Sequence, residues 1–293
     1  MTLLVNPSSG GGRALKVLPA VQTTLRATGL RVTVRHTESL EHARVLARTA
    51  AGTGATVVTL SGDGLVGAVA GALADVEGAV LGVLPGGRGN DFARVAGIPR
   101  NAVAACAVIA TGVPTALDLG EVDGRPFVGI ASLGFDSVVN RIANDAPALL
   151  GRLVYAYGAA RAIGGWRAAG FTVTVDGRER RFRGWSVAVA NSKAYGGGMF
   201  LAPAADLQDG RLDVVMTDEC SRLRFARTLP KVFKGTHVDE DVVHLMGGRE
   251  VQISADRPFT VYADGDPIGE LPVTIRCRPG AITVLLPATG SSA

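Results

Sequence analysis

Strand-like apolar runs alternate with helix-like segments throughout the first 117 residues, and this alternation constrains the fold more than any other feature. The runs are TLLVN, RVTVRHT, ATVVTL and AVLGVLP, and segments with apolar residues at helical spacing separate them. Repeated strand–helix–strand units are typical of a mostly parallel sheet covered by helices. Such a sheet binds its ligand beyond the carboxyl ends of its strands. We therefore predict an α/β N-terminal domain with its site at that edge.

The pattern changes near Leu117, where short strand-like segments follow one another with few helices between them. TVDGRERRF carries a hairpin signal at Asp176-Gly177, because Asp-Gly favours the tight turn between antiparallel strands. A run of strands with few crossovers favours a mainly antiparallel β-sandwich as the second domain. The predicted domains are residues 1–117, rejoined by the C-terminal tail 283–293, and residues 118–282.

Composition limits the classes of function. Glycine supplies 39 of 293 residues, about 13% against roughly 7% on average, in clusters typical of loops shaped for close approach. The net charge of +4 comes without interleaved basic and aromatic residues, so no nucleic-acid partner is expected. Three widely spaced cysteines form neither a disulfide framework nor a CxxC metal site. Without a signal-peptide pattern or a long apolar run, we expect a cytoplasmic protein that has no transmembrane segment and meets membranes only peripherally.

Three glycine-bearing loops follow three of the predicted parallel strands. They are NPSSGGG (Asn6–Gly12), SGDG (Ser61–Gly64) and PGGRGND (Pro85–Asp91). Glycines let backbone N–H groups approach an oxyanion, and the helix N-termini that follow add positive potential. One such loop alone is ordinary strand-to-helix chemistry, and neither GxxxxGK[ST] nor a post-strand GxGxxG is present. Three loops sharing one edge predict a site for the phosphates of a nucleotide.

Asp63 is the unexpected residue of the SGDG loop. A carboxylate at a phosphate site repels its ligand unless a divalent cation lies between the two. Alternatively, Asp63 caps the helix that follows. The sequence leaves both interpretations open.

Several motifs occur in an order that resembles a known family. VNPSSGGGRA, SGDG, PGGRGNDFAR, NSKAYGGGMFLAPAADLQDGRLDVV and YADGDP span nearly the whole chain. Together they resemble the diacylglycerol kinase catalytic-domain family, which includes bacterial lipid kinases and sphingosine kinases. The resemblance implies an enzyme that uses ATP and Mg²⁺ to phosphorylate a lipid hydroxyl at the membrane surface. It also implies an α/β nucleotide-binding domain and a β-sandwich lipid-binding domain with the site between them.

The resemblance further implies a set of nucleotide contacts. These residues are Asn6, Ser9, Gly10, Thr37, Ser61, Gly62, Asp63, Gly64, Arg88 and Asn90. Arg88 stands where many relatives carry threonine, and an arginine there can itself reach phosphate. For Asn90 and Asp91, the favoured role is to fix their loop and cap the next helix.

The resemblance assigns catalysis to Asp266, together with Asp63. In relatives an acidic residue at the place of Asp266 is the proposed general base, because the lipid hydroxyl must lose its proton as it attacks the γ-phosphorus. Asp264 would support the turn or the metal. A plain hairpin turn is the alternative explanation of Asp264-Gly265-Asp266, since Asp and Gly favour turns.

ADLQDGRL matches a loop that holds a structural magnesium in some bacterial relatives. By position, the ligands would be the Asp209 carboxylate with the backbone oxygens of Asp206 and Arg211. An ordinary β-turn around Asp209-Gly210 is an almost equally good account.

Leu65, Gly67 and Ala68 depart from the family pattern, which has Thr, Asn and Glu at these places. The departures keep a catalytically impaired nucleotide- or lipid-binding relative as one alternative. A soluble-acceptor kinase of the NAD kinase type is another, although the late DGD and the NDF loop argue against it. The sequence does not name the lipid, which is diacylglycerol-like or related, and a homodimer is one option for the oligomeric state.

One predicted helix, SRLRFARTLPKVFKG (Ser221–Gly235), bears on membrane contact. It places Arg224, Arg227, Lys231 and Lys234 on one face, which suits an anionic lipid surface. A solvated helix face is the simpler interpretation, and Pro230 is expected to bend or break the helix.

Overall fold

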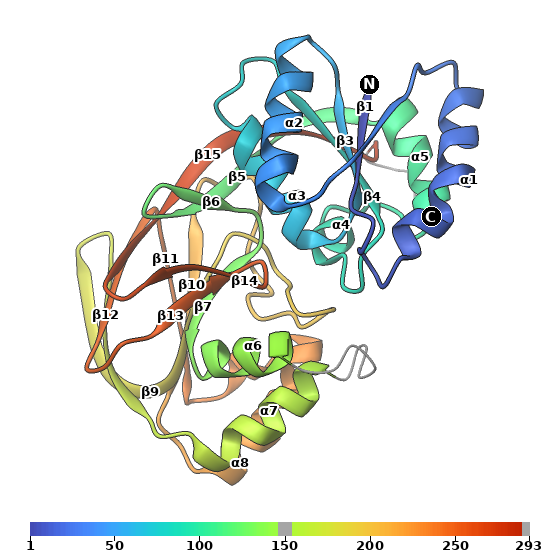
Figure 1. Cartoon of the computed structure of the whole chain (residues 1–293). Helices are drawn as coiled ribbons and strands as arrows, with labels where there is room; N and C mark the ends of the chain where they lie inside the picture. Colours follow the sequence, from blue (N-terminus) through green and yellow to red (C-terminus); the bar gives the residue numbers. More distant parts are fainter. Residues whose placement is uncertain (146–153, 289–293) are drawn as a thin grey trace. The chain divides into compact units, whose positions relative to one another are not determined.

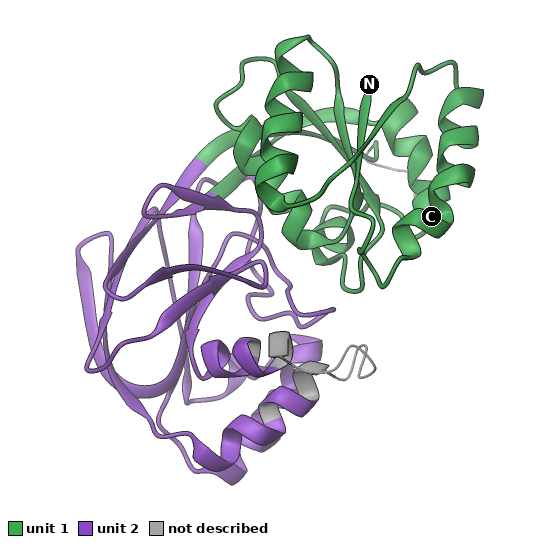
Figure 2. Cartoon of the chain, viewed as in Figure 1, with its two compact units in different colours: residues 1–119, 279–293 green, residues 120–278 purple. Residues whose placement is uncertain are grey.

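The computed structural model describes residues 1–145 and 154–288, which form two compact units. Unit 1 comprises Met1–Leu119 and Pro279–Ala293, and unit 2 comprises Gly120–Arg278 (Figure 2). The chain leaves unit 1 within strand β5 (Val113–Val122) and returns within strand β15 (Val273–Leu286). Unit 1 is therefore built from both ends of the chain.

Unit 1 contains a parallel sheet in the order β4-β3-β1-β2 (Figure 1). Its strands are β1 (Thr2–Val5), β2 (Thr33–His36), β3 (Val57–Ser61) and β4 (Val80–Pro85). The last part of β15 adds a further parallel strand beside β4, with Thr283 opposite Val80. β3 is buried throughout, as expected of a strand with both faces covered, whereas the edge strand β2 is largely exposed.

Helices cover both faces of this sheet. They are α1 (Arg13–Ala27), α2 (Leu40–Gly52), α3 (Asp63–Leu73), α4 (Asp91–Val95) and α5 (Ala102–Thr111). Figure 1 shows α2 and α3 on one side of the sheet and α1 and α5 on the other. Ser39 caps α2 by accepting a hydrogen bond from the His42 N–H, and α3 is buried from Leu65 to Leu73 because it carries only apolar and small residues there.

Unit 2 is built on antiparallel strands in the order β14-β13-β7-β9-β8-β12-β15, with β10 between β9 and β11. Their bounds are β6 (Arg125–Phe127), β7 (Ile130–Gly134), β8 (Ala169–Val175), β9 (Arg178–Ala190), β10 (Leu212–Asp218), β11 (Val243–Gly248), β12 (Glu250–Ala255), β13 (Thr260–Ala263) and β14 (Asp266–Glu270). The predicted hairpin joins β8 to β9, and Asp176 (φ 46°) and Gly177 (φ 82°) both have the positive φ that such a turn needs.

The core of unit 2 lies between its strands and its helices α6 (Phe135–Asp145), α7 (Val154–Gly165) and α8 (Arg222–Thr228). Trp185 stacks on Phe225 with ring centroids 3.8 Å apart, and Phe135 meets both rings edge-on. The predicted fold class, an α/β N-terminal domain with a mostly parallel sheet and a mainly antiparallel, sandwich-like second domain, is confirmed.

Candidate active site

The three glycine-bearing loops pack against one another at the carboxyl edge of the parallel sheet. A Cβ atom on Gly10 would lie 2.5 Å from the carbonyl oxygen of Gly86, and one on Gly87 would lie 2.4 Å from Cα of Gly62. Contacts this short leave no room for any side chain. Glycine at these positions therefore lets the first, second and third loops meet, and the predicted convergence is observed within unit 1.

The first loop presents backbone groups ahead of α1. Gly10, Gly11 and Gly12 have φ values of 60°, 69° and 85°, a left-handed run that residues with side chains rarely adopt. The Asn6 side chain braces the loop, because its Oδ1 accepts hydrogen bonds from the Ser8 N–H at 3.0 Å and the Ser8 hydroxyl at 2.8 Å. Ser9 is buried in the loop.

The third loop is held by Asn90, which has φ 53°. Its Oδ1 accepts a hydrogen bond from the Gly87 N–H at 2.8 Å, and its Nδ2 donates to the Gly87 carbonyl at 3.1 Å. These contacts match the loop-fixing role considered from the sequence. Arg88 is exposed at the loop, so its guanidinium stands in solvent beside the glycines.

Asp63 opens α3 and connects it to α4. One carboxylate oxygen accepts a hydrogen bond from the Phe92 N–H at 3.0 Å, and Gly62 rather than Asp63 is the N-cap residue of α3. Capping of the following helix, one of the two interpretations left open by the sequence, is not observed, and Asp63 instead bonds to the first turn of α4. Within the part of the chain that the structure describes, the other Asp63 oxygen has no hydrogen-bond partner.

Thr37 and Ser61 lie at the strand ends beneath the loops. The Thr37 hydroxyl donates to the carbonyl oxygen of Val5 at 3.3 Å, and Thr37 is buried. Ser61 is buried at the end of β3, where its carbonyl accepts a hydrogen bond from the Gly86 N–H at 2.7 Å. Both residues thus connect strands to loops, and Gly64 lies partly exposed in the first turn of α3.

Two contacts of unit 1 were not predicted from the sequence, although Asp91 was expected to fix its loop and cap the next helix. Asp91 is buried at the start of α4, 4.0 Å from Nε of Arg94, whose Nη2 also donates to the Gly89 carbonyl at 3.5 Å. Arg13 reaches across from α1 and donates to the Gly87 carbonyl at 3.4 Å. Charged residues directly beside glycine loops are the signal that could have identified both.

In unit 2 the two aspartates of the late DGD motif have different surroundings. Asp264 has φ 53°, and its carboxylate accepts hydrogen bonds from the Val128 and Gly129 N–H groups, both at 2.9 Å. Asp266 is exposed at the first position of β14. Asp264 and Gly265 lie in the turn that the sequence offered as the alternative explanation of this motif, and Asp264 fixes the backbone there while Asp266 is exposed.

Asn191, in the NSKAYGGG motif, completes the hold on the Val128-Gly129 peptide. Its Nδ2 donates to the Val128 carbonyl at 3.0 Å, and its backbone N–H donates to the Gly129 carbonyl at 2.9 Å. Asn191 received no role from the sequence alone, although the residue lies in one of the motifs that resemble the family. The residue lies far from Val128 along the chain, so only the folded structure reveals the contact.

The predicted magnesium loop consists of two short side-chain turns. Asp206 Oδ1 accepts from the Gln208 N–H at 3.0 Å, and Asp209 Oδ1 accepts from the Arg211 N–H at 2.9 Å. Burial, and secondly the nearby Asp209 carboxylate, raise the pKa of Asp213 above its usual range. Within residues 1–145 and 154–288, no cluster of three His, Cys, Asp or Glu side chains is placed to hold a metal ion. The predicted set relied instead on one carboxylate and two backbone oxygens.

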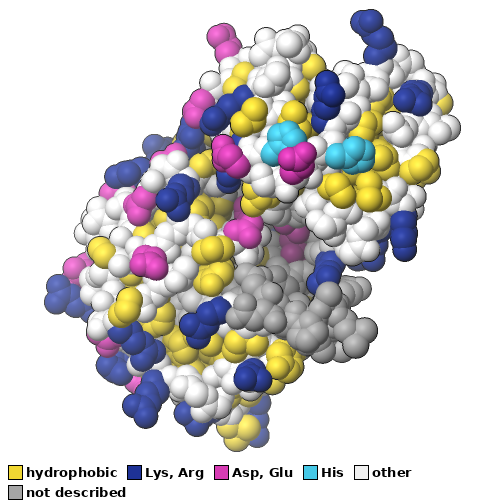
Figure 3. All heavy atoms as spheres, viewed as in Figure 1, with side chains coloured by type: hydrophobic (Ala, Val, Ile, Leu, Met, Phe, Trp, Pro, Cys, Tyr) yellow, Lys and Arg dark blue, Asp and Glu magenta, His cyan; other side chains and the backbone are white. Residues whose placement is uncertain are grey.

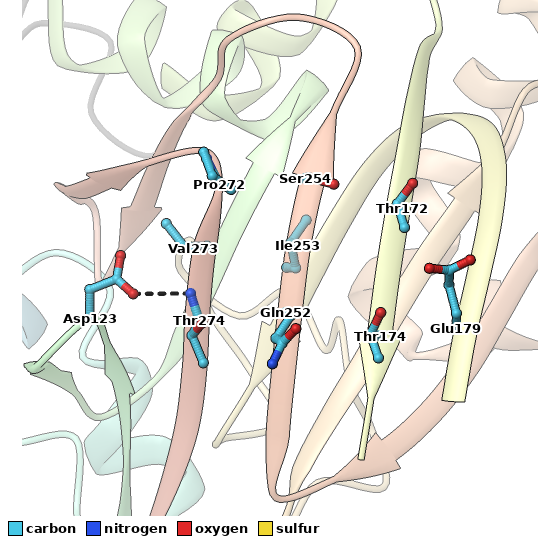
Figure 4. A pocket seen from close by; sticks show the side chains of 10 residues that line it. All are labelled: Asp123, Thr172, Thr174, Glu179, Gln252, Ile253, Ser254, Pro272, Val273 and Thr274. Carbon is cyan, nitrogen blue, oxygen red and sulfur yellow. Dashed lines mark hydrogen bonds between the residues drawn. The ribbon is translucent and has the colours of Figure 1, made fainter. Parts of the chain in front are cut away.

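Unit 2 also contains a groove of about 390 Å³, which is lined by residues other than those predicted for the site (Figure 4). Thr172, Thr174 and Gln252 line it from β8 and β12, and Asp123 accepts a hydrogen bond from the Thr274 N–H at 3.0 Å. These are polar strand positions with none of the predicted catalytic residues. The groove therefore shares no residue with the candidate site.

Charged side chains of both signs are scattered over the visible surface among apolar and uncharged groups (Figure 3). No described helix combines the length and the apolar character needed to cross a membrane.

Comparisons with known proteins point in one direction. Two family models match the chain, the diacylglycerol kinase catalytic domain over residues 1–122 and the YegS C-terminal NAD kinase beta sandwich-like domain over residues 129–286. A diacylglycerol kinase of Mycobacterium tuberculosis is 35% identical, over 99% of this chain and 96% of that protein. A diacylglycerol kinase of Bacillus subtilis is 26% identical, over 92% and 90%. A crystal structure of a diacylglycerol kinase from Bacillus anthracis has a TM-score of 0.77 at 21% identity, covering 97% and 96% of the two chains, and supports the fold.

Proposed function

This chain belongs to the diacylglycerol kinase family and is a phosphotransferase, and on that premise we propose that it transfers the γ-phosphoryl group of ATP to the hydroxyl of a diacylglycerol-like lipid. The observation that carries the proposal is the contact among three glycine loops at one edge of a parallel sheet, with the Asp63 carboxylate among them.

The phosphates would lie against the glycine loops of unit 1. Gly10, Gly62 and Gly64 carry no side chain of their own, so phosphate oxygens could approach their backbone N–H groups, and α1 and α3 begin at the same edge. Asn90 would act by holding the third loop, and the exposed Arg88 would contribute a charge-assisted hydrogen bond. Asn6, Ser9, Thr37 and Ser61 would shape the floor and wall of this site.

Mg²⁺ fits the donor set at Asp63. The carboxylate is held by the Phe92 N–H through one oxygen, which leaves the other available as a hard ligand. When bound, the ion would neutralise charge on the β- and γ-phosphates. Asp63 would hold the phosphates in place through that charge rather than by direct contact.

Asp266 would act as the general base. Its exposed carboxylate at the start of β14 would accept the proton of the lipid hydroxyl as the oxygen bonds to the γ-phosphorus and ADP leaves. Asp264 would position Asp266, since its own carboxylate is occupied by the Val128 and Gly129 N–H groups.

Unit 2 would carry the lipid, and the loop of Asp206, Asp209 and Arg211 would hold a structural magnesium through one carboxylate and two backbone oxygens. In this proposal the enzyme works in the cytoplasm and associates peripherally with membrane. Relatives named diacylglycerol kinase favour diacylglycerol as the acceptor. The product would be a phosphorylated lipid that enters phospholipid biosynthesis.

A second candidate is a relative that binds nucleotide without turnover. Leu65 and Ala68 are buried in α3, and neither they nor Gly67 can supply a side-chain hydrogen bond where the family carries Thr, Asn and Glu. The absence of these side-chain hydrogen bonds favours weaker binding and positioning of the nucleotide than in other members of the family.

Incubation of the purified chain with γ-labelled ATP, Mg²⁺ and a total lipid extract tests the proposal. We expect label in one lipid class, identified by chromatography and mass spectrometry, and enhanced labelling when diacylglycerol is added. ATP binding without any labelled lipid would support the second candidate. Label in NAD, supplied without lipid or detergent, would overturn the lipid assignment.

A further inference from the structure

Helix α8, labelled in Figure 1, is followed by the 3₁₀-helix η2 (Leu229–Lys234), and an exposed apolar strip runs along the two. Leu223 is 61% exposed and Phe233 is 56% exposed, and Ala226 and Pro230 lie exposed between them. The spacing of three, four and three residues keeps these side chains on one face as the α-helix passes into the 3₁₀-helix. We call these four residues the α8 strip.

The opposite face of α8 and η2 packs into the interior of unit 2. Phe225 stacks on Trp185, Thr228 is buried, and Val232 is buried in a second core cluster. The orientation of the α8 strip is therefore fixed by packing on the other face, and Leu223 and Phe233 point away from the core. Large apolar side chains gathered on an exposed face are a recognised mark of an interaction surface.

Cations without acidic partners lie along this strip. Arg227 and Lys234 are exposed, and neither forms an ion pair within the described part of the chain. Arg224 and Lys231, by contrast, pair with Asp241 and Glu240. The four-cation face expected from the sequence is thus half neutralised, and the remaining charge flanks the apolar residues.

A second group of cations adjoins the start of α8. Arg222 donates to the Trp166 carbonyl at 3.4 Å, and Arg257 donates to the Arg167 carbonyl. The Arg257 guanidinium lies over the rings of Trp166 and Phe259, at 5.2 and 5.1 Å from their centroids. Among the described residues, Arg167, Arg222 and Arg257 have no acidic partner within 4.0 Å. Arg222 lies next to Leu223 in the chain, so this group borders the strip.

We propose that the α8 strip and its flanking cations dock on an anionic lipid surface. Leu223 and Phe233 would enter the region below the headgroups, while Arg167, Arg227 and Lys234 bind lipid phosphates. The charge complementarity favours this occupant, since apolar side chains bordered by unpaired cations match the interface of a negatively charged bilayer. A nucleic acid would use the cations but gain nothing from Leu223. The idea rests on the proposed function only in so far as a lipid substrate requires contact with a membrane.

Vesicle flotation of the full chain without ATP tests the proposal. The apolar variant carries Leu223→Ser with Phe233→Ser, and the charge variant carries Arg167→Gln, Arg227→Gln and Lys234→Gln. The matched control carries Leu245→Ser with Arg178→Gln, which changes an exposed leucine (51%) and an exposed arginine elsewhere on unit 2. Thermal unfolding of all variants verifies that they fold.

The wild-type chain and the control should bind vesicles of phosphatidylcholine mixed with phosphatidylglycerol, and phosphatidylcholine alone much less. Added NaCl should weaken binding. Each cation removed should lower the partition coefficient about fivefold, and each apolar side chain removed should lower it roughly tenfold. The rate of phosphoryl transfer to a short-chain diacylglycerol that is dissolved as monomers should be the same in the wild-type chain and in all variants.

Equal binding by the wild-type chain and both variants would overturn the proposal, as would equal binding to neutral and anionic vesicles. An equal loss in the control, or binding of an oligonucleotide in place of vesicles, would overturn it too. The two proposals fail separately. A wild-type chain that floats with anionic vesicles but phosphorylates no lipid would contradict the kinase assignment alone.

Discussion

At the scale of single residues, the two aspartates of the DGD motif have different surroundings, and the proposal gives them different tasks. Asp264 has both carboxylate oxygens occupied by backbone N–H groups, whereas Asp266 is exposed at the start of β14. We predict that Asp266→Asn abolishes phosphoryl transfer, because an amide cannot accept the hydroxyl proton, while ATP affinity and thermal stability stay near wild type. Steady-state kinetics and nucleotide titration provide the measurements, and unchanged turnover would refute the base assignment.

Replacement of Asp264 should have the opposite effect, because it should lower the stability of the fold. Asp264→Ala removes the acceptor for two partly buried N–H groups, at Val128 and Gly129, so we expect a loss of roughly 2 kcal/mol or more in the free energy of unfolding. Chemical denaturation monitored by tryptophan fluorescence measures this loss. If Asp264→Ala were as stable as the wild-type chain, the turn would not depend on that carboxylate.

At the scale of elements, the contact between the second and third glycine loops sets the geometry of the candidate site. Gly87→Ala would place a methyl group 2.4 Å from Cα of Gly62, so one loop must move. A displacement of about 1 Å commonly costs on the order of 100-fold in catalysis, and we expect kcat/KM to fall by that order. Gly52→Ala, at the end of α2 with no atom within 4 Å of the new Cβ, is the control and should behave as wild type. Similar kinetics for the two variants would contradict the role of close loop packing.

The buried His237 gives unit 2 a dependence on pH. Burial lowers the pKa of His237, whose Nε2 donates to the Leu201 carbonyl at 3.0 Å while Nδ1 is buried without a partner among the described residues. The folded chain thus resists a proton that the unfolded chain accepts, and stability falls as pH drops below about 6.5, by up to about 1.4 kcal/mol per pH unit. The midpoint temperature of thermal unfolding should fall as the pH is lowered from 7.5 to 5. His237→Gln should remove the part of this fall that His237 causes.

Other groups add slopes of their own, so the variant must be compared with wild type at every pH. Burial raises the pKa of Asp136 to about 7. The folded chain therefore keeps a proton on Asp136 that the unfolded chain releases, and this group lowers stability as pH rises from about 4 to 7. The contribution of His237 has the opposite sign. Identical pH profiles for wild type and His237→Gln would show that His237 does not titrate as described.

At the scale of the complete chain, the features of the fold that local residue patterns encode could be predicted from the sequence. Buried parallel strands are continuous apolar runs, so the strands and the edge shared by three loops followed from the residues themselves. Contacts between distant residues leave no such pattern, which is why the bonds from Asp264 and Asn191 to the Val128-Gly129 peptide were not foreseen. The ion pairs of Arg224 and Lys231 escaped for the same reason. Pro230 was expected to interrupt its helix, and the chain changes there from α8 to η2.

The return of β15 to unit 1 makes both ends of the chain necessary for one sheet. Ile282 and Val284 are buried there, and the Gly280 N–H donates to the buried Asp118 carboxylate at 2.7 Å. We predict that a chain ending at Arg278 loses the protease resistance of unit 1, because β4 is uncovered and Asp118 loses that donor. Unit 2 should remain protected. Limited proteolysis with mass spectrometry measures both, with the exposed Arg276→Ala as a control, and equal protection of unit 1 in the shortened chain would contradict the prediction.

This arrangement also orders events during synthesis on the ribosome. Residues 120–278 are contiguous, so unit 2 is fully translated before the strand that completes unit 1 leaves the exit tunnel. The sheet formed by the first 119 residues stays open beside β4 until the last part of β15 emerges. The nascent N-terminal half is thus the part of this protein that most needs chaperone protection while translation continues.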